Sequence, residues 1–420
     1  MPLVEGCKHE LEITVPPDAV EQETERVITK IKNRARIPGF RPGKAPVSMV
    51  KTRFAGEIRQ EVIEALVPRF FYQKAEAEGL KVVGSPDISQ VHFHPGEALT
   101  FKAEFEVLPE FELQEYRNLP VSYNEPEATD EEVEAALERV RERHAVYTNL
   151  DPRPLADGDN AVVKLESTAT PAGVEAIRQD EIMVEVGGAD TLSAFTEALR
   201  GSSPGDVREA SVTYPDDYGE RRLAGKDVTY RIEVLGLRSK ELPELNDELA
   251  KDEGDFRDLE ELRDRARAEI QAAKRDQAQR EAKAKLVDTL IDAHDFSVPE
   301  VLVERQVRAN LERGIRSLAE SGVDPSKLSI DWKKVHEREQ PRAAREVKAT
   351  LLLDRVASAE HLHATQDEVD RQVQLYARQI SEPVAVARAK LAEQGALDRI
   401  ASQIRHEKTL QFLFEQSRKE

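Results

Sequence analysis

The chain has 420 residues and a formal net charge of −20, and 34% of its residues are charged while only 5% are aromatic. This composition argues against one large core and favours several small modules or an elongated helical body. Its one cysteine, Cys7, excludes an intrachain disulfide, and no run approaches the roughly 20 apolar residues of a membrane-spanning helix. With no apolar signal segment at the N-terminus, we expect a soluble protein of the reducing cytoplasm that has no membrane partner.

Residues 1–112 are predicted to form a small α+β module. Apolar residues alternate with polar ones from Leu11 to Val15 and again over 101–107, which indicates two half-buried strands. A helix is expected after the first strand, up to about Arg34, while the terminus that carries Cys7 is expected to be flexible. A second helix is indicated by apolar residues at four-residue spacing, namely Ile58, Val62, Leu66 and Phe70.

The most basic stretch of the chain, 26–56, runs from the last part of the first predicted helix to the start of the second. It contains nine Lys or Arg and no Asp or Glu. Three prolines and two glycines between Ile37 and Pro46 forbid a helix at its centre and predict a loop. A positive island on an acidic protein indicates an anionic partner, although a solvated helix face that lacks acids would give the same composition.

The loop Gly39-Phe40-Arg41-Pro42-Gly43-Lys44-Ala45-Pro46 resembles the G-F-R-x-G-x-x-P signature of trigger factor, a family of ribosome-associated bacterial chaperones. Many members have Lys where this chain has Pro42. The resemblance implies docking on a ribosomal protein and adjacent rRNA beside the exit tunnel of the large ribosomal subunit. It also implies binding of nascent and unfolded polypeptides, and it allows a homodimer away from the ribosome. The ribosome-binding residues that it implies are Gly39, Phe40, Arg41, Gly43, Lys44 and Pro46.

Residues 113–150 are predicted to connect two domains. Pro120 and Pro126 favour an extended chain, and Thr129 with Glu132 forms the capping-box pattern of a helix start. Apolar residues from Val133 onward give this helix one apolar face. Because a lone helix of this length is marginal in water, we expect it to pack on the C-terminal body.

Residues 151–240 resemble the FKBP-like prolyl isomerase domain of the trigger factor family, with short strands and one helix over 192–199. Leu192-Ser193-Ala194-Phe195 stands where the family has I-P-G-F, and Tyr214-Pro215-Asp216-Asp217-Tyr218, Leu223-Ala224-Gly225-Lys226 and Val228-Thr229-Tyr230 follow. Lys164 to Ser167 depart from the usual D-F-T-G, and the F-x-G-G loop has no clear counterpart. The resemblance implies a cleft lined by Phe195, Tyr218 and Tyr230, with Leu192 and Leu199 at its floor.

Such a cleft needs neither a cofactor nor an acid or base. Rotation about an X–Pro bond has a barrier of about 20 kcal/mol because amide resonance stiffens the bond. An apolar aromatic cleft desolvates the carbonyl and favours the twisted state. Alternatively, the same side chains are ordinary core residues of a small barrel. We expect no metal site, because the pairs His92/His94 and His361/His363 lack a third ligand nearby.

Residues 241–420 are predicted to be helical throughout, with narrow apolar stripes and heavily charged outer faces. Ser297 is expected to cap a helix, with Phe296 packed against Val301. Such helices favour paired arms around a concave surface, where scattered apolar side chains hold an unfolded chain. Between Gly39 and Lys44 the chain is one residue too short for a phosphate loop, so the predicted chaperone uses no ATP.

The sequence therefore predicts a multidomain α+β protein with a ribosome-binding domain (1–112), a connector (113–150), an FKBP-like domain (151–240) and a helical chaperone domain (241–420). The predicted function is an ATP-independent chaperone that docks at the ribosomal exit tunnel, shields nascent chains and isomerises prolyl bonds. One alternative is a holdase acting away from the ribosome, whose FKBP-like module only binds prolyl segments. A dedicated nucleic-acid binder is less favoured, because acids dominate outside the basic stretch.

Overall fold

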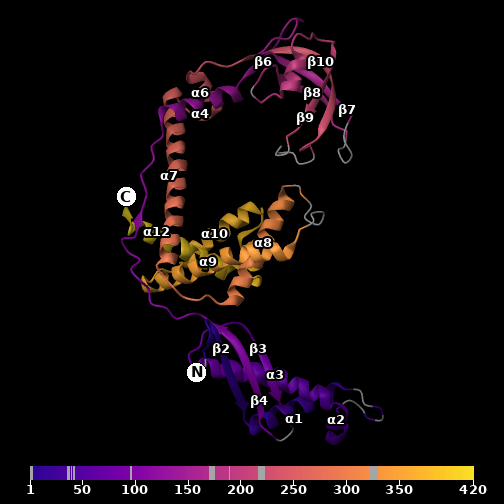
Figure 1. The fold of residues 1–420 in the computed structure, drawn as a ribbon, viewed down its shortest axis with the longest axis vertical. Coiled ribbons are helices and arrows are strands. Elements are labelled where there is room, and N and C mark those ends of the chain that lie inside the picture. Colours follow the sequence, from indigo (N-terminus) through magenta and orange to yellow (C-terminus); the bar gives the residue numbers. More distant parts are fainter. Residues whose placement is uncertain are drawn as a thin grey trace. The chain divides into compact units, whose positions relative to one another are not determined.

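A computed structural model describes residues 3–35, 38, 40, 43–94, 97–169, 176–188, 190–215, 223–321, 323 and 330–420. The chain forms two compact units, one comprising Met1–Asn124 with Gln279–Glu420 and the other Glu125–Ala278. The chain contains both helices and antiparallel sheets (Figure 1), so the predicted α+β class is confirmed.

The N-terminal module has a four-stranded antiparallel sheet in the order β1-β2-β4-β3. Leu11 lies opposite Ala103 and Ile13 opposite Phe101, so the two alternating segments of the sequence pair directly and face one core. Two long helices and one short helix accompany this sheet (Figure 1). The elements are β1 (Leu3–Glu5), β2 (Lys8–Val15), α1 (Pro17–Arg34), α2 (Val47–Arg53), α3 (Ala55–Ala77), β3 (Val82–His92) and β4 (Leu99–Val107).

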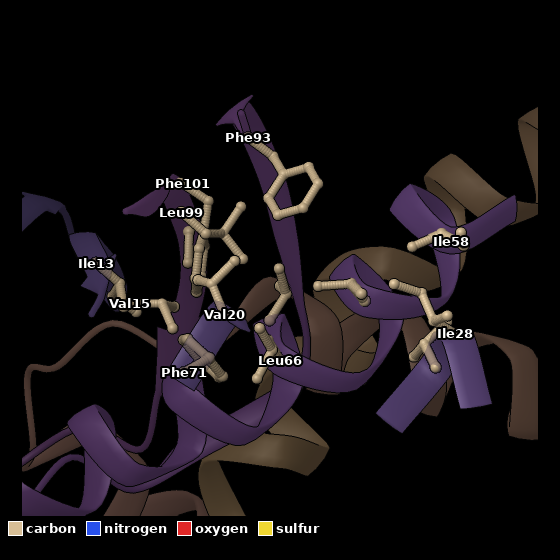
Figure 2. Close-up of a cluster of buried hydrophobic side chains, with 14 of the residues drawn as sticks. Ile13, Val15, Val20, Ile28, Ile58, Leu66, Phe71, Phe93, Leu99 and Phe101 are labelled. Atoms are coloured by element: carbon tan, nitrogen blue, oxygen red, sulfur yellow. The ribbon is translucent and has the colours of Figure 1, made fainter. Parts of the chain in front are cut away.

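The core of this module lies between the sheet and helices α1 and α3. Figure 2 shows side chains of both layers meeting there, among them Val15, Leu66 and Phe101. The predicted stripe on α3 is correct up to Leu66, but Phe71 rather than Phe70 is fully buried. Val67 next to Leu66 is buried too, and the buried positions then continue at four-residue spacing from Val67 to Phe71 and Ala75.

Two predictions, one at Cys7 and one at Ser297, are wrong. Cys7 is only 7% exposed, and its thiol donates to the carbonyl oxygen of Ser297 at 3.2 Å, so the chain is packed at Cys7. Ser297 is not an N-cap, because helix α8 (Glu300–Glu320) begins after Pro299. Proline disfavours the helical conformation of the residue that precedes it, so Val298 stays outside the helix. Phe296 instead stacks on Phe111, with ring centroids 4.1 Å apart.

The remaining helices of this unit pack through small cores. Val303 and Val307 of α8 meet Ala343 and Val347 of α9 in one of them. In another, the end of α7 packs against α9, α12 and the chain around Phe111, and β5 pairs in parallel with β11. None of the helices in the described residues is long and apolar enough to cross a membrane. These elements are β5 (Pro120–Val121), α7 (Leu259–Asp292), α9 (Trp332–Ala359), α10 (Gln366–Gln379), α11 (Val384–Glu393), α12 (Ala396–Glu415) and β11 (Arg418–Lys419).

The second unit holds a five-stranded antiparallel sheet in the order β6-β10-β7-β8, with β9 also paired to β10. The capping box at Thr129 and Glu132 is present, and Leu137 of α4 packs against Leu249 and Leu262. The elements are α4 (Asp130–Arg143), β6 (Val146–Asn149), β7 (Asn160–Ala169), β8 (Arg178–Glu185), α5 (Ser193–Leu199), β9 (Val207–Thr213), β10 (Asp227–Glu241) and α6 (Asp247–Glu253), together with the first part of α7.

Candidate functional site

The predicted basic loop joins the end of α1 to the start of α2, where Pro46 occupies the N-cap position. The amide of Gly43 donates to the carbonyl oxygen of Lys32 at 3.0 Å, which ties the loop to the last turn of α1. Ala45 is buried in the core of the module. The second half of the loop is therefore held against the module, while Gly39 and Arg41 lie outside the described residues.

The side chain of Phe40 is exposed on this loop, with 39% of its surface open to solvent. Lys44 and Pro46 are exposed as well. Complete burial of an aromatic side chain of this size contributes roughly 1.5–3 kcal/mol. Phe40 therefore offers an apolar anchor to any surface that can cover it.

The folded module neutralises part of the basic stretch. Lys30 of α1 pairs with Glu61 of α3 at 2.9 Å, and Arg34 pairs with both Glu57 and Glu61. The hydrogen bond from Lys30 is the main cause that lowers the pKa of Glu61 below its usual value. Sequence reasoning missed these pairs, because both acids follow the acid-free stretch and are brought back to it only by the packing of α3 on α1.

Other cations of the stretch keep their charge open to a partner. Arg26 makes only a longer contact of 3.7 Å with Glu23 on its own helix. Among the described residues, Lys32, Lys44, Lys51 and Arg53 make no ion pair. The unpaired positive charge of the described residues thus lies on the last turn of α1, on the loop that carries Phe40 and on α2.

The second candidate site lies on the sheet of the second unit. Phe195 of α5 is partly exposed, and its ring meets Tyr230 of β10 edge to face, with centroids 5.4 Å apart. Leu192 is also partly exposed, whereas Leu199 and Tyr230 are buried. The structure therefore brings four of the five predicted residues into one cluster, and Tyr218 lies outside the described residues.

Sequence reasoning did not name Tyr214 as a site residue. Its hydroxyl lies 2.8 Å from that of Tyr230, and both rings are buried. The signal was present, because Tyr214 belongs to one of the segments on which the resemblance rests. The full burial of Leu199 favours the alternative that it is an ordinary core residue. Phe195 contacts the same core but keeps part of its side chain exposed to solvent.

The segment that departs from the family pattern, Lys164 to Ser167, belongs to β7 and pairs with β10, while the pairing of β7 with β8 shifts register between Val163 and Leu165. Leu165 points into the core opposite Ile232 of β10. Ser167 is bonded to Ile177 twice, through its amide and its hydroxyl, each at 2.8 Å. These residues therefore support the sheet beside the aromatic cluster.

The helical part of the first unit exposes several large apolar side chains on heavily charged helices. Leu375 is the most exposed of them at 56%. Isolated exposed apolar residues are common on proteins, but Leu375 and Tyr376 are adjacent on α10. The exposed residues of this part include Trp332, Leu375, Tyr376, Val384 and Val386.

Comparisons with known proteins agree in one result. Two family models match, described as bacterial trigger factor protein over residues 2–140 and as bacterial trigger factor protein C-terminus over residues 258–415. The chain is 53% identical over 419 residues to the trigger factor of Solibacter usitatus, covering 100% of this chain and 99% of that protein. It is 39% identical over 408 residues to the trigger factor of Koribacter versatilis, covering 96% and 93%.

One solved structure is similar over nearly the whole length. It comes from work on promiscuous substrate recognition in the folding and assembly activities of the trigger factor chaperone. The TM-score is 0.59 at 19% sequence identity, with 99% of this chain and 98% of the other covered. At this identity the likeness concerns the fold alone.

Proposed function

The chain belongs to the trigger factor family of chaperones, and we propose that it docks through loop 36–46 beside the exit tunnel of the large ribosomal subunit. In this proposal it acts in the cytoplasm and receives nascent chains as they emerge. The side chain of Phe40 becomes buried against a ribosomal protein, and the neighbouring cations contact rRNA phosphates. The proposed contact residues are Gly39, Phe40, Arg41, Gly43, Lys44 and Pro46.

The exposure of Phe40 among unpaired cations is the observation that carries this proposal. An apolar ring that folding leaves open, on a loop tied to α1 through Gly43, suits a rigid partner surface. Lys32, Lys44 and Arg53 supply the charge that a phosphate backbone attracts. A chaperone that acts away from the ribosome would give this arrangement no role.

Cosedimentation of the full chain with 70S ribosomes tests the docking proposal. The double variant Phe40→Ala/Arg41→Ala should no longer pellet with ribosomes. Tyr72→Ala is the matched control, because it removes an exposed aromatic ring from the same module but from α3. Wild-type binding should also weaken as the salt concentration rises, because phosphate contacts release counterions. Pelleting of the double variant at the wild-type level would show that the loop is not the anchor.

We further propose that residues 151–240 form the isomerase domain and that a prolyl segment binds against Phe195. The ring of Phe195 offers an apolar surface that is backed by Tyr230 and Leu199. Removing water from the prolyl carbonyl favours the twisted amide, in which resonance is lost. The buried side chains support Phe195 from below, and Leu192 lies beside it on the same cluster.

A protease-free assay of cis-to-trans conversion in a prolyl peptide tests this step on the full chain. Phe195→Ala should remove most of the rate above background. Val207→Ala is a suitable control, because Val207 is exposed on the same sheet outside the core cluster. An unchanged rate in Phe195→Ala would refute the assignment. A wild-type rate equal to background would leave this domain with prolyl binding only.

We also propose that the helical part holds unfolded chains by many weak apolar contacts. Leu375, Tyr376 and Trp332 are exposed there, and each contact supplies a fraction of the roughly 1.5–3 kcal/mol of a fully buried side chain. Exchange is then fast and requires no ATP. Light scattering of a refolding client should show aggregation suppressed by the full chain without nucleotide, and unchanged aggregation would refute this part.

A further inference from the structure

A groove runs along the bundle of α10, α11 and α12, and its volume is about 800 Å³. The three helices share a small core around Val369, Val373 and Leu391. Helix α10 buries Val369, Val373 and Ala377 on one face. Its residues Leu375 and Tyr376 are not part of this buried face and line the groove. The apolar lining consists of Leu375, Tyr376, Leu391, Ala396, Ile400 and Ile404.

The acids of the groove are already paired. Glu368 accepts from Lys408 at 2.7 Å, and Glu407 accepts from Lys283 of α7 at 2.8 Å. The ammonium group of Lys408 is the first cause that lowers the pKa of Glu368, to about 2. Glu368 therefore stays ionised and bound to Lys408 at neutral pH, and neither member of that pair is left to attract a ligand.

The two arginines of the groove, one on each wall, are not paired in this way. Arg371 donates to the backbone oxygen of Asp367, and Arg399 donates to that of Gln394, each at 3.3 Å. Within the described residues neither guanidinium meets a carboxylate. On a chain with a net charge of −20, this groove therefore presents unmatched positive charge beside an apolar surface.

The two arginines lie on different helices of the groove, Arg371 on α10 and Arg399 on α12. A peptide in the groove can therefore meet a guanidinium group from either helix.

We propose that this groove binds apolar segments of unfolded polypeptide that carry Asp or Glu. The proposal rests on the chaperone function proposed above and names the segments that this part of the chain selects. Apolar side chains of the segment cover Leu375 and Tyr376, and its carboxylates pair with Arg371 and Arg399. Segments rich in Lys or Arg are disfavoured in the same groove, because they meet like charge.

Fluorescence anisotropy with the full chain tests this selectivity. Three short labelled peptides share a Leu–Phe core and carry two Glu, two Gln or two Lys at the same two positions. The Glu peptide should bind more tightly than the Gln peptide, by about two- to fivefold for each exposed ion pair, and the Lys peptide should bind most weakly. Equal affinities, or a tighter Lys peptide, would overturn the proposal.

Variants separate charge from apolar contact. Arg371→Gln/Arg399→Gln should abolish the preference for the Glu peptide and leave the affinity for the Gln peptide unchanged. Leu375→Ser should weaken the binding of all three peptides. Arg378→Gln is the matched control, because it removes an exposed arginine of α10 that does not line the groove. A preference for the Glu peptide that survives in the double variant would overturn the proposal.

Two further outcomes would also overturn it and identify what failed. If sedimentation shows a dimer of the free chain that Leu375→Ser abolishes, and no peptide binds, the groove is covered by a second copy. If no peptide binds but wild type and Leu375→Ser suppress client aggregation equally, the groove is not a client site and the proposed chaperone function stands. A wild-type chain that suppresses no aggregation would instead refute the proposed function itself.

Discussion

Replacing Gly43 by Ala should weaken ribosome binding without unfolding the protein. Gly43 has φ +82°, a conformation that L-residues with a Cβ rarely adopt. A Cβ at this position would also lie 3.2 Å from Oδ1 of Asn33. The backbone strain alone costs about 1–2 kcal/mol. It opposes the hydrogen bond from Gly43 to Lys32 that ties the loop to α1.

This strain corresponds to about a 5- to 30-fold shift from the tied loop to a released loop. Ribosome affinity should fall by up to this factor, because only the tied loop presents Phe40 in the binding geometry. Gly43→Asn should lose less, since Asn tolerates positive φ better than Ala. Quantitative cosedimentation measures the affinities, and thermal unfolding should show nearly the same transition for all variants.

Gly56→Ala is the matched control for this experiment. Gly56 lies in α3 without positive φ, and no atom lies within 4 Å of the added Cβ. Ala at a helical position stabilises by roughly 0.5–1 kcal/mol relative to Gly, so this variant should bind ribosomes like wild type. If Gly43→Ala and Gly56→Ala bind equally well, the tie between the loop and α1 does not present Phe40, and the reasoning fails.

Two further predictions concern stability. Leu137→Ala should lower the free energy of unfolding, measured in urea, by about 2–5 kcal/mol, because Leu137 is fully buried where α4 packs on α6 and α7. Glu131→Ala, on the exposed face of α4, should change this free energy little. Lys408 and the cap at Thr365 hold the pKa of Glu368 at about 2, below the ordinary value of 4.5. The ionised carboxylate therefore stabilises the fold above pH 4.5, and this contribution is lost as the pH falls toward 2. The difference in unfolding free energy between wild type and Glu368→Gln should therefore be constant above about pH 5 and shrink at lower pH, and a difference that does not change with pH would contradict the assignment.

The sequence predicted well those elements whose own residues carry a regular pattern. The alternation at Leu11 to Val15 and over 101–107 is enough to indicate strands, because each has one buried face, and these two segments pair in the structure. Strand β3 has no such alternation. Its pairing with β4 shifts register twice, so buried and exposed positions do not follow a period of two.

The charge of the candidate docking surface could be predicted only in part. The acid-free stretch is visible in the sequence, but the pairing of Lys30 and Arg34 with Glu61 depends on how α3 packs against α1. Likewise, motif reasoning found Phe195 and Tyr230, whereas the hydroxyl pair of Tyr214 and Tyr230 requires the register of β9 and β10. Contacts between elements far apart in the chain leave no local pattern to detect.

Photocrosslinking from the loop tests the docking proposal most directly. A benzophenone amino acid is placed at position 40 of the full chain, or at position 72 as the control, because Phe40 and Tyr72 are both exposed aromatic residues of the same module. Irradiation with translating ribosomes should crosslink position 40 to a protein of the large subunit at the tunnel exit, and position 72 should give little product. The account is contradicted if position 40 gives no ribosomal crosslink while position 72 does.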